Sequence, residues 1–250
     1  MTAPSTLDDK RAMGGNLKTV EPGALDSLIG WWREAGVEVV VGETPRGWLR
    51  ADEAASPVSA PAPATTASVA EPPADFAAFR DWLATSSGLP MDRSGAVRVA
   101  PHGTVGAPVM LLSDLPGGED AAEGKPIGGA AYALAVRMLA AIGVEADAAY
   151  FASLACFHAP GARIGGDELE ACAALARDHI RHAKPQRLIL LGDAPARALL
   201  GEPLARVRGR VHKVEGVRTV ATFHPRWLLQ RPSDKALAWR DLLLLMSEND

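Results

Sequence analysis

Short apolar runs alternate with segments of helical periodicity from about residue 75 to the end of this 250-residue chain. Four apolar runs have the length of strands, at residues 109–112, 150–155, 187–191 and 217–223. Apolar positions three and four residues apart predict helices before and between them, at residues 76–83, 131–142, 169–182 and 195–200. This alternation is typical of a parallel sheet covered by helices on both faces. We therefore expect an α/β fold, a three-layer α/β/α sandwich with a central four-stranded parallel sheet.

The residues before this domain follow a different pattern and divide into two segments. Residues 1–50 form a small appendage, in which apolar side chains recur at helical spacing from 22 to 35 and a short strand follows. Residues 51–74 are rich in Ala, Pro, Ser and Thr, a composition typical of a disordered and fairly extended linker. We place the main domain at residues 75–250 and interpret the appendage as a docking element. Its protein partner is not identified by the sequence.

The charge balance gives no sign of a generally basic nucleic-acid binder. Lysine and arginine total 26 against 30 aspartate and glutamate, so any contact with nucleic acid must come from a local patch. The chain shows no signal-peptide layout and no run of about 18 apolar residues. Two cysteines argue against a disulfide framework and fit a reducing compartment. These features predict a soluble, cytoplasmic protein without membrane contacts, which we expect to be a monomer.

Chemically useful side chains follow the first and the last of the four predicted strands. Asp114 comes one step after the first apolar run, and His224 follows the last one, directly before Pro225. Ligands of open α/β sheets bind beyond the carboxyl ends of the strands, and an imidazole there suits chemistry near neutral pH. A solvent-exposed carboxylate and a helix-capping histidine are the alternatives. The residues by themselves leave both readings open.

The segment from His224 to Leu229, HPRWLL, is followed by a helix that contains AWRDL. This segment resembles the second motif of the uracil-DNA glycosylase superfamily, closest to its iron–sulfur branch, family 4. The family motif begins His-Pro-Ser, so Arg226 departs from it. Ser-Asp-Leu-Pro-Gly at residues 113–117 resembles the first motif, Gly-Glu-Ala-Pro-Gly, and places Asp114 on the catalytic carboxylate. The resemblance spans about residues 75–245 and implies the three-layer fold of the family.

The resemblance also implies a base pocket, in which this chain departs from the family twice. The family pattern Gly-x-Pro-Phe-Val-Gly has a phenylalanine that stacks on the flipped base, and Ile127 takes its position here. Ala152 stands where the family has an asparagine that reads uracil. With Pro116 and Gly117, these residues form the implied pocket. Loss of the aromatic face and of the amide should weaken uracil recognition.

The two cysteines match part of the family's cluster site. Cys156 and Cys172 are sixteen positions apart, the family spacing for two of four cluster ligands. A [4Fe–4S] cluster normally takes four thiolates, and residues 85–95, where the other pair is expected, contain none. We predict that the cluster has been lost, that no metal or other cofactor is needed, and that both thiols are buried as small apolar groups.

A cationic segment precedes the last strand, with Arg206, Arg208 and Arg210 followed by His212 and Lys213 on an expected hairpin. A solvated charged face is one reading. We favour contact with the DNA backbone, because the hairpin leads directly into the strand that ends at His224.

The resemblance implies a mechanism and a DNA partner, single- or double-stranded and possibly uracil-containing. His224 would donate a hydrogen bond to the oxygen of the departing base, and Asp114 would orient or deprotonate the attacking water. The segment Pro225, Arg226, Trp227 and Leu228 would contact DNA and wedge the base stack. We expect a glycosylase that removes a deaminated or damaged base in base excision repair. The alternative is a nucleic-acid-binding accessory that has lost catalysis, and a nucleotide-binding protein ranks lower because no Walker or GxGxxG pattern is present.

Overall fold

The computed structural model describes residues 72–162 and 164–247. The appendage expected at residues 1–50 and nearly all of the linker expected at 51–74 lie outside the described residues, so both remain predictions. The described part begins with helix α2 (Phe76–Thr85), which the apolar periodicity predicts. Asp75 caps this helix by accepting a hydrogen bond from the Ala78 amide at 3.0 Å.

A five-stranded sheet forms the centre of the domain, in the order β3-β2-β5-β7-β6. Four strands are parallel, and they are the four that the apolar runs predict: β2 (Met110–Ser113), β3 (Tyr150–Ser153), β5 (Arg187–Leu191) and β7 (Val217–Thr222). The fifth, β6 (His212–Val214), pairs antiparallel with β7 at the edge of the sheet. The sequence analysis did not predict this strand as part of the sheet, because three residues carry too little pattern to indicate one.

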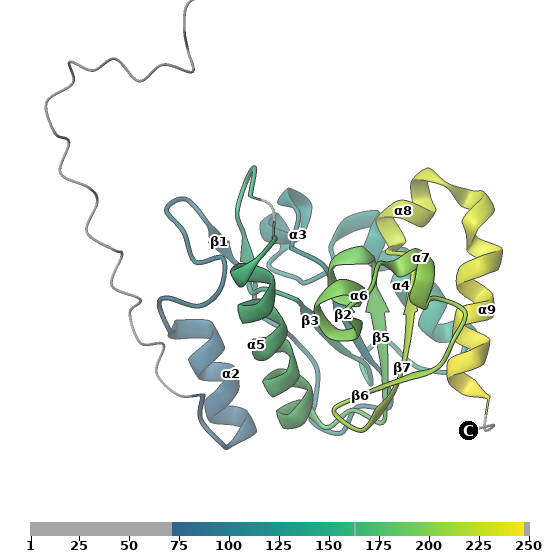
Figure 1. The fold of residues 1–250 in the computed structure, drawn as a ribbon, viewed down its shortest axis with the longest axis horizontal. Helices are drawn as coiled ribbons and strands as arrows, with labels where there is room; N and C mark the ends of the chain where they lie inside the picture. The colour runs from purple at the N-terminus through teal and green to yellow at the C-terminus, as the bar shows by residue number, and fades with distance from the viewer. Residues whose placement is uncertain (1–71, 163, 248–250) are drawn as a thin grey trace, which may run out of the picture. The chain divides into compact units, whose positions relative to one another are not determined.

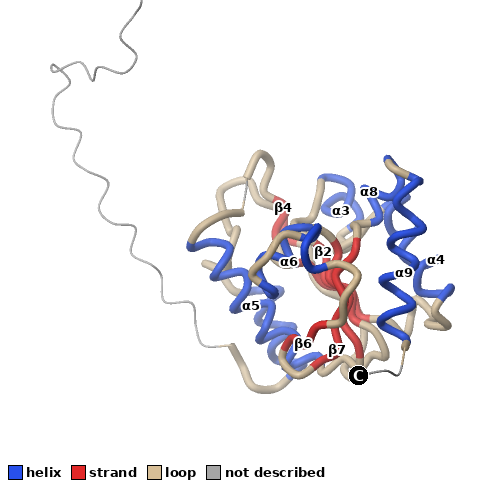
Figure 2. The backbone as a smooth tube through the Cα atoms, turned by 45° about the vertical axis from the view of Figure 1, so that its right-hand side comes forward, coloured by secondary structure: helices blue, strands red, loops and turns tan. Residues whose placement is uncertain are grey.

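Helices cover both faces of the sheet (Figures 1 and 2). Helices α2, α5 (Asp167–Ala183) and α6 (Asp193–Leu200) lie on one face, and α4 (Gly129–Ala141) and α9 (Lys235–Met246) lie on the other. The strands are buried on both sides and therefore lack the alternation of a half-exposed sheet. The expected three-layer α/β/α sandwich is confirmed.

Successive residues of each strand feed two separate cores. On β2, Met110 and Leu112 pack in the core beneath α2 and α5, whereas Leu111 packs beneath α4 and α9. Leu190 and Ile189 of β5 divide in the same way. Burial of this kind stabilises by about 1.5–3 kcal/mol for each large aliphatic side chain. The two cores fix the register of the strands and therefore the positions of the loops that follow them.

The cationic segment differs from the hairpin that we expected. Arg206 lies on a short helix, α7 (Leu204–Val207), and Arg208 and Arg210 lie in the loop after it. The β6–β7 hairpin begins only at His212, and its turn places Glu215 and Gly216 at positive φ. A helix of one turn is too short to show a hydrophobic period, so the pattern could not separate it from the hairpin.

Several other short elements lack a sequence signature for the same reason. They are β1 (Val97–Arg98), which pairs with β4 (Phe157–His158), and the helical segments α3 (Gly118–Glu123), α8 (Pro225–Gln230) and η2 (Pro232–Asp234). Of these, α3 and α8 border the candidate site. Within residues 72–162 and 164–247, no helix combines the length and the apolar character that crossing a bilayer requires.

Candidate active site

The two predicted catalytic residues lie together at the carboxyl edge of the sheet. Strands β2 and β7 flank β5 on either side, so Asp114 after β2 and His224 after β7 face each other across the end of β5. His224 Nε2 and Asp114 Oδ1 are 3.8 Å apart. Gly192 follows β5 with φ of 103°, and a Cβ atom there would lie 3.7 Å from His224 Cβ and 3.8 Å from Asp114 Oδ2. These contacts are of ordinary length, so it is the positive φ at this position that favours glycine.

The geometry around His224 makes its imidazole a neutral hydrogen-bond donor. The residue caps helix α8, and its Nδ1 accepts a hydrogen bond from the Arg226 amide at 3.1 Å. Because Nδ1 is the acceptor, Nε2 carries the proton of the neutral ring. Burial lowers the pKa of His224 to about 3, and the charge of Arg226 contributes to the lowering. The helix-capping alternative is therefore also true, since the cap is what orients Nε2 toward Asp114.

Asp114 is more accessible, with 36% of its side chain exposed. Burial raises the pKa of Asp114 to about 6, the Arg226 guanidinium opposes the rise, and the Asp120 carboxylate adds to it. The carboxylate is therefore mostly charged at pH 7 and becomes protonated in mild acid. A group that titrates this close to neutral pH suits general base catalysis.

A cavity of about 630 Å³ opens beside the pair, and Asp114, His224, Arg208, Phe223 and Trp227 are among its lining residues. Four side-chain polar atoms in the described part of the chain are buried without a hydrogen-bond partner. Three of them belong to this lining: Asp114 Oδ1, His224 Nε2 and Arg208 Nε. Buried polar groups in native proteins are nearly always paired, so a cluster of exceptions calls for an explanation. A ligand in the cavity could supply their partners.

The residues expected to form the base pocket do not line this cavity. Ile127 and Ala152 are fully buried, each in a different core. Pro116 is buried too, and its carbonyl accepts a hydrogen bond from His158 Nδ1 at 2.8 Å. Both side chains pack inside the fold, and their assignment to a base pocket stays a prediction. The aromatic surface of the cavity comes instead from Phe223 and Trp227, whose rings stack 6.3 Å apart.

Asp120 is central to the site, although sequence reasoning assigned it no role. Its carboxylate is fully buried and accepts hydrogen bonds from the Gly117 and Gly128 amides, each at 2.6 Å. It also pairs with the Arg226 guanidinium. Asp120 therefore joins the loop after β2, the loop before α4 and helix α8. Its place three residues after the helix cap at Gly117 is the signal that could have indicated this capping role.

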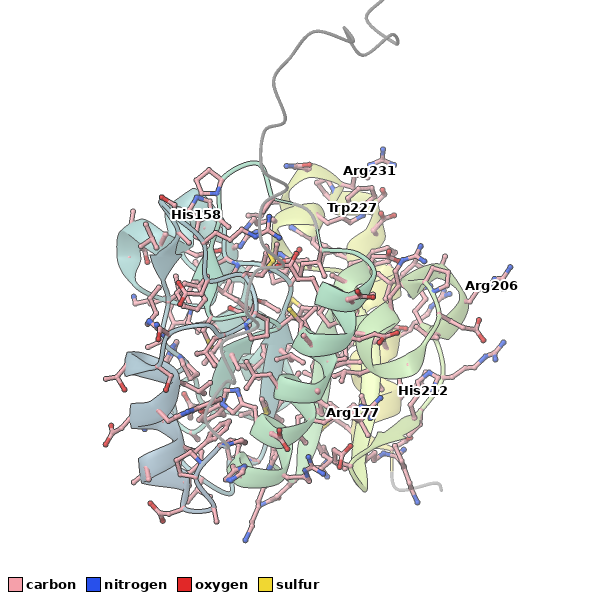
Figure 3. All side chains as sticks on the ribbon, turned by 60° about the vertical axis from the view of Figure 1, so that its left-hand side comes forward. His158, Arg177, Arg206, His212, Trp227 and Arg231 are labelled. Atoms are coloured by element: carbon pink, nitrogen blue, oxygen red, sulfur yellow. The ribbon has the colours of Figure 1, made fainter. Side chains whose placement is uncertain are left out.

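The expected wedge segment is divided between buried and exposed side chains. Pro225 and Leu228 are buried, and Arg226 points inward to the carboxylates of Asp114 and Asp120. These three residues are therefore not placed to enter a base stack in this conformation. Trp227 and Leu229 are 39% and 42% exposed. Figure 3 shows Trp227 at the same end of the domain as His158 and Arg231.

The three arginines of the cationic segment also differ in their surroundings. Arg206 and Arg210 are exposed, which suits contact with phosphates. Arg208 instead binds the buried carboxylate of Asp241, with an N···O distance of 3.0 Å, and its guanidinium stacks on the Phe223 ring at 4.9 Å. Arg208 is thus part of the cavity wall, and its contact with phosphates stays a prediction.

The two thiols do not fit a four-thiolate cluster. Cys156 and Cys172 are buried in the core that also holds Leu89 and Met91, in the region where the other two ligands were expected. The described residues contain no group of three or more His, Cys, Asp or Glu that could hold a metal ion. Burial raises the pKa of Cys156 to about 11 and that of Cys172 to about 12. In the protein without a metal, both thiols are therefore protonated at neutral pH.

Two curated relatives and one family profile match this chain. A type-4 uracil-DNA glycosylase of Pyrobaculum aerophilum is 25% identical over 181 residues, covering 68% of this chain and 92% of that protein. A type-4 uracil-DNA glycosylase of Archaeoglobus fulgidus is 27% identical over 137 residues, covering 50% of this chain and 69% of that protein. The sequence profile of the Uracil DNA glycosylase superfamily matches residues 100–243, more than half of the chain and both strand ends of the site. The chain belongs to the uracil-DNA glycosylase superfamily.

Proposed function

We propose that the chain is a DNA glycosylase that hydrolyses the N-glycosidic bond of a flipped, deaminated or damaged base during base excision repair. The observation that carries this proposal is the pair of buried, unpartnered atoms, Asp114 Oδ1 and His224 Nε2, that face each other beside a cavity of about 630 Å³. This volume is in the range of small-molecule sites, about 300–1,000 Å³. The relatives act as uracil-DNA glycosylases, which supports the same class of reaction here.

In this mechanism His224 stabilises the leaving base. Its Nε2–H donates a hydrogen bond to a carbonyl oxygen of the base, on which negative charge develops as the glycosidic bond lengthens. The imidazole stays neutral, because burial lowers the pKa of His224 to about 3. It therefore acts by hydrogen bonding and does not deliver a full proton. A donor of this kind contributes on the order of 10²–10³-fold in rate.

Asp114 acts on the opposite side of the breaking bond. As a carboxylate it offsets the positive charge that develops on the sugar, and its Oδ1 orients the attacking water and accepts its proton. The distance of 3.8 Å to His224 Nε2 is too long for a hydrogen bond, so neither atom satisfies the other. The two groups are thus left to be completed by substrate and water.

Binding to DNA would use the exposed groups around the cavity. Arg206 and Arg210 are exposed and suit phosphate contacts, and the exposure of Trp227 and Leu229 supports a role in filling the space that a flipped base leaves. The stacked rings of Phe223 and Trp227 give the cavity an aromatic wall, on which a base could stack. The two thiols take no part, and we infer that the protein works without a cluster.

One observation favours the second candidate, a DNA-binding accessory without catalysis. Ile127 and Ala152 replace the residues that read uracil in the family, and both are fully buried in the cores. A protein that cannot read a base could still bind DNA. The cavity that both Asp114 and His224 line is the reason for ranking the enzyme first.

The test is base release from labelled oligonucleotides that contain uracil, hypoxanthine or xanthine. We expect the wild-type protein to release at least one of these bases, and expect Asp114→Asn and His224→Ala to slow release by on the order of 10²–10³-fold. Asp81→Asn makes the same carboxylate-to-amide change at an exposed position of α2 and should leave release unchanged. DNA binding without any base release would establish the accessory function instead.

A further inference from the structure

A charged pair joins the loop after β2, the loop before α4 and helix α8. Asp120 is fully buried and holds the amides of Gly117 and Gly128, each at 2.6 Å, together with the Arg226 guanidinium. The same guanidinium has its other nitrogen 3.8 Å from Asp114 Oδ1. Arg226 thus lies between a structural carboxylate and the one to which we assign catalysis.

We propose that Asp120 and Arg226 are a positioning pair that sets the charge state of Asp114, an inference that rests on the proposed function for the role of Asp114 in catalysis. Neither residue needs to touch the substrate. Both act through Asp114.

Charged or titratable groups from the surrounding elements share the site with Asp114. These are Arg226 on α8, His224 at the end of β7, Asp120 on α3, Asp193 on α6 and Arg208 after α7. His224 is neutral near pH 7, because its pKa is lowered to about 3. Asp193 forms an ion pair with Arg197, and Arg208 forms an ion pair with Asp241. Arg226 and Asp120 are the two charged groups that act on the pKa of Asp114, and they act in opposite directions, Arg226 lowering it and Asp120 raising it.

Because Arg226 and Asp120 act on the pKa of Asp114 in opposite directions, replacing them should shift the pH profile in opposite directions. A purely structural role would not produce such shifts. Asp114 must be deprotonated to activate water, so base release should fall as the pH falls through its pKa. Arg226→Gln removes the cation, which raises the pKa of Asp114 and moves the acidic limb to higher pH. Asp120→Asn removes the anion, which lowers that pKa and moves the limb to lower pH. The Arg226 guanidinium lies 3.8 Å from Asp114 Oδ1, and an opposite charge this close changes a pKa by about 1 or more.

His224 keeps its tautomer in these variants. Its Nδ1 is held by the main-chain amide of Arg226 and not by the guanidinium, and Arg226→Gln retains that amide. The tautomer of the imidazole therefore stays the same in the variants. Because Arg226→Gln also removes a charge that lowers the pKa of His224, the titration of Asp114 itself must be followed beside the acidic limb of base release.

The experiment is a carboxyl-carbon NMR titration of Asp114 in the full chain, run beside the pH profile of base release. The proteins are wild type, Arg226→Gln, Asp120→Asn and the double variant, with Asp114→Asn used to assign the signal. Arg240→Gln, which removes a positive charge from an exposed position on α9, is the matched control. Thermal unfolding of each variant shows which proteins are folded.

We expect the midpoint of the titration near pH 6 in the wild type and the Arg240→Gln control. It should lie higher by about 1 in Arg226→Gln, lower in Asp120→Asn, and between these two in the double variant. Midpoints that agree in all variants, or that move in one direction, would overturn the inference. If Asp120→Asn does not fold, Arg226→Lys decides the matter, since it keeps the charge and should keep the midpoint that Arg226→Gln raises. A wild type that releases no base refutes the proposed function, while the titration still tests the pair.

Discussion

The carboxyl edge of the sheet and the region of the two thiols differ in how their polar groups are satisfied. At the edge, Asp114 Oδ1 and His224 Nε2 are buried without partners beside a cavity. Around Cys156 and Cys172 the packing is apolar, and burial raises the pKa of both thiols. Unpartnered polar atoms are costly unless a ligand completes them, whereas a buried thiol behaves as a small apolar group. The contrast supports retained chemistry at the edge and a packing role for the cysteines.

The largest expected difference is in the rate of base release, between a variant that lacks both thiols and one that lacks the Asp114 carboxylate. In Cys156→Ala/Cys172→Ala, base release should stay within about threefold of the wild type, whereas Asp114→Asn should lose on the order of 10²–10³-fold. Removal of the buried sulfur atoms should cost about 1 kcal/mol of unfolding free energy for each cysteine. Single-turnover release and urea unfolding measure the two effects.

Iron content is the control for this prediction. Protein purified without oxygen should contain no stoichiometric iron, because the whole chain has two cysteines and a cluster normally takes four thiolates. A full cluster, or loss of release in a folded double-cysteine variant, would contradict the packing role.

The second comparison is between the stability losses of three alanine variants, at Arg208, His224 and Arg206. Arg208→Ala leaves the buried carboxylate of Asp241 without its cation and should cost about 3–5 kcal/mol of unfolding free energy. His224→Ala loses only its hydrogen bond to the Arg226 amide and some packing, so about 1 kcal/mol is expected. Arg206→Ala, at an exposed position, should change stability by less than about 0.5 kcal/mol. Equal losses in Arg208→Ala and Arg206→Ala would show that the Asp241 pair does not stabilise the domain.

The sequence predicts the sheet well because burial on both faces leaves continuous apolar runs. The run at 187–191 matches β5 to the residue, and the one at 109–112 is displaced from β2 by a single position. The topology then brings Asp114 and His224 together, since carboxyl ends of parallel strands share one edge. The short strand β6 and the one-turn helix α7 escape prediction, because neither spans a hydrophobic period.

The finer parts of the site depend on packing that no local pattern contains. Ile127 is fully buried in the core between the sheet and α4, a position that depends on tertiary packing and not on its neighbours in the sequence. The inward turn of Arg226 depends on Asp120, 106 positions earlier in the chain. Arg208 likewise finds Asp241 on the last helix, α9. Long-range ion pairs of this kind explain why motif positions predict the catalytic pair but not its surroundings.

The most direct test of the account is a double-mutant cycle on the rate of base release at the preferred substrate, with Asp114→Asn, His224→Ala and both together. Groups that act on one transition state are not additive, so the double variant should be about as slow as the slower single variant. Protein that releases a base at the wild-type rate after both replacements would show that the Asp114–His224 pair is not the active site.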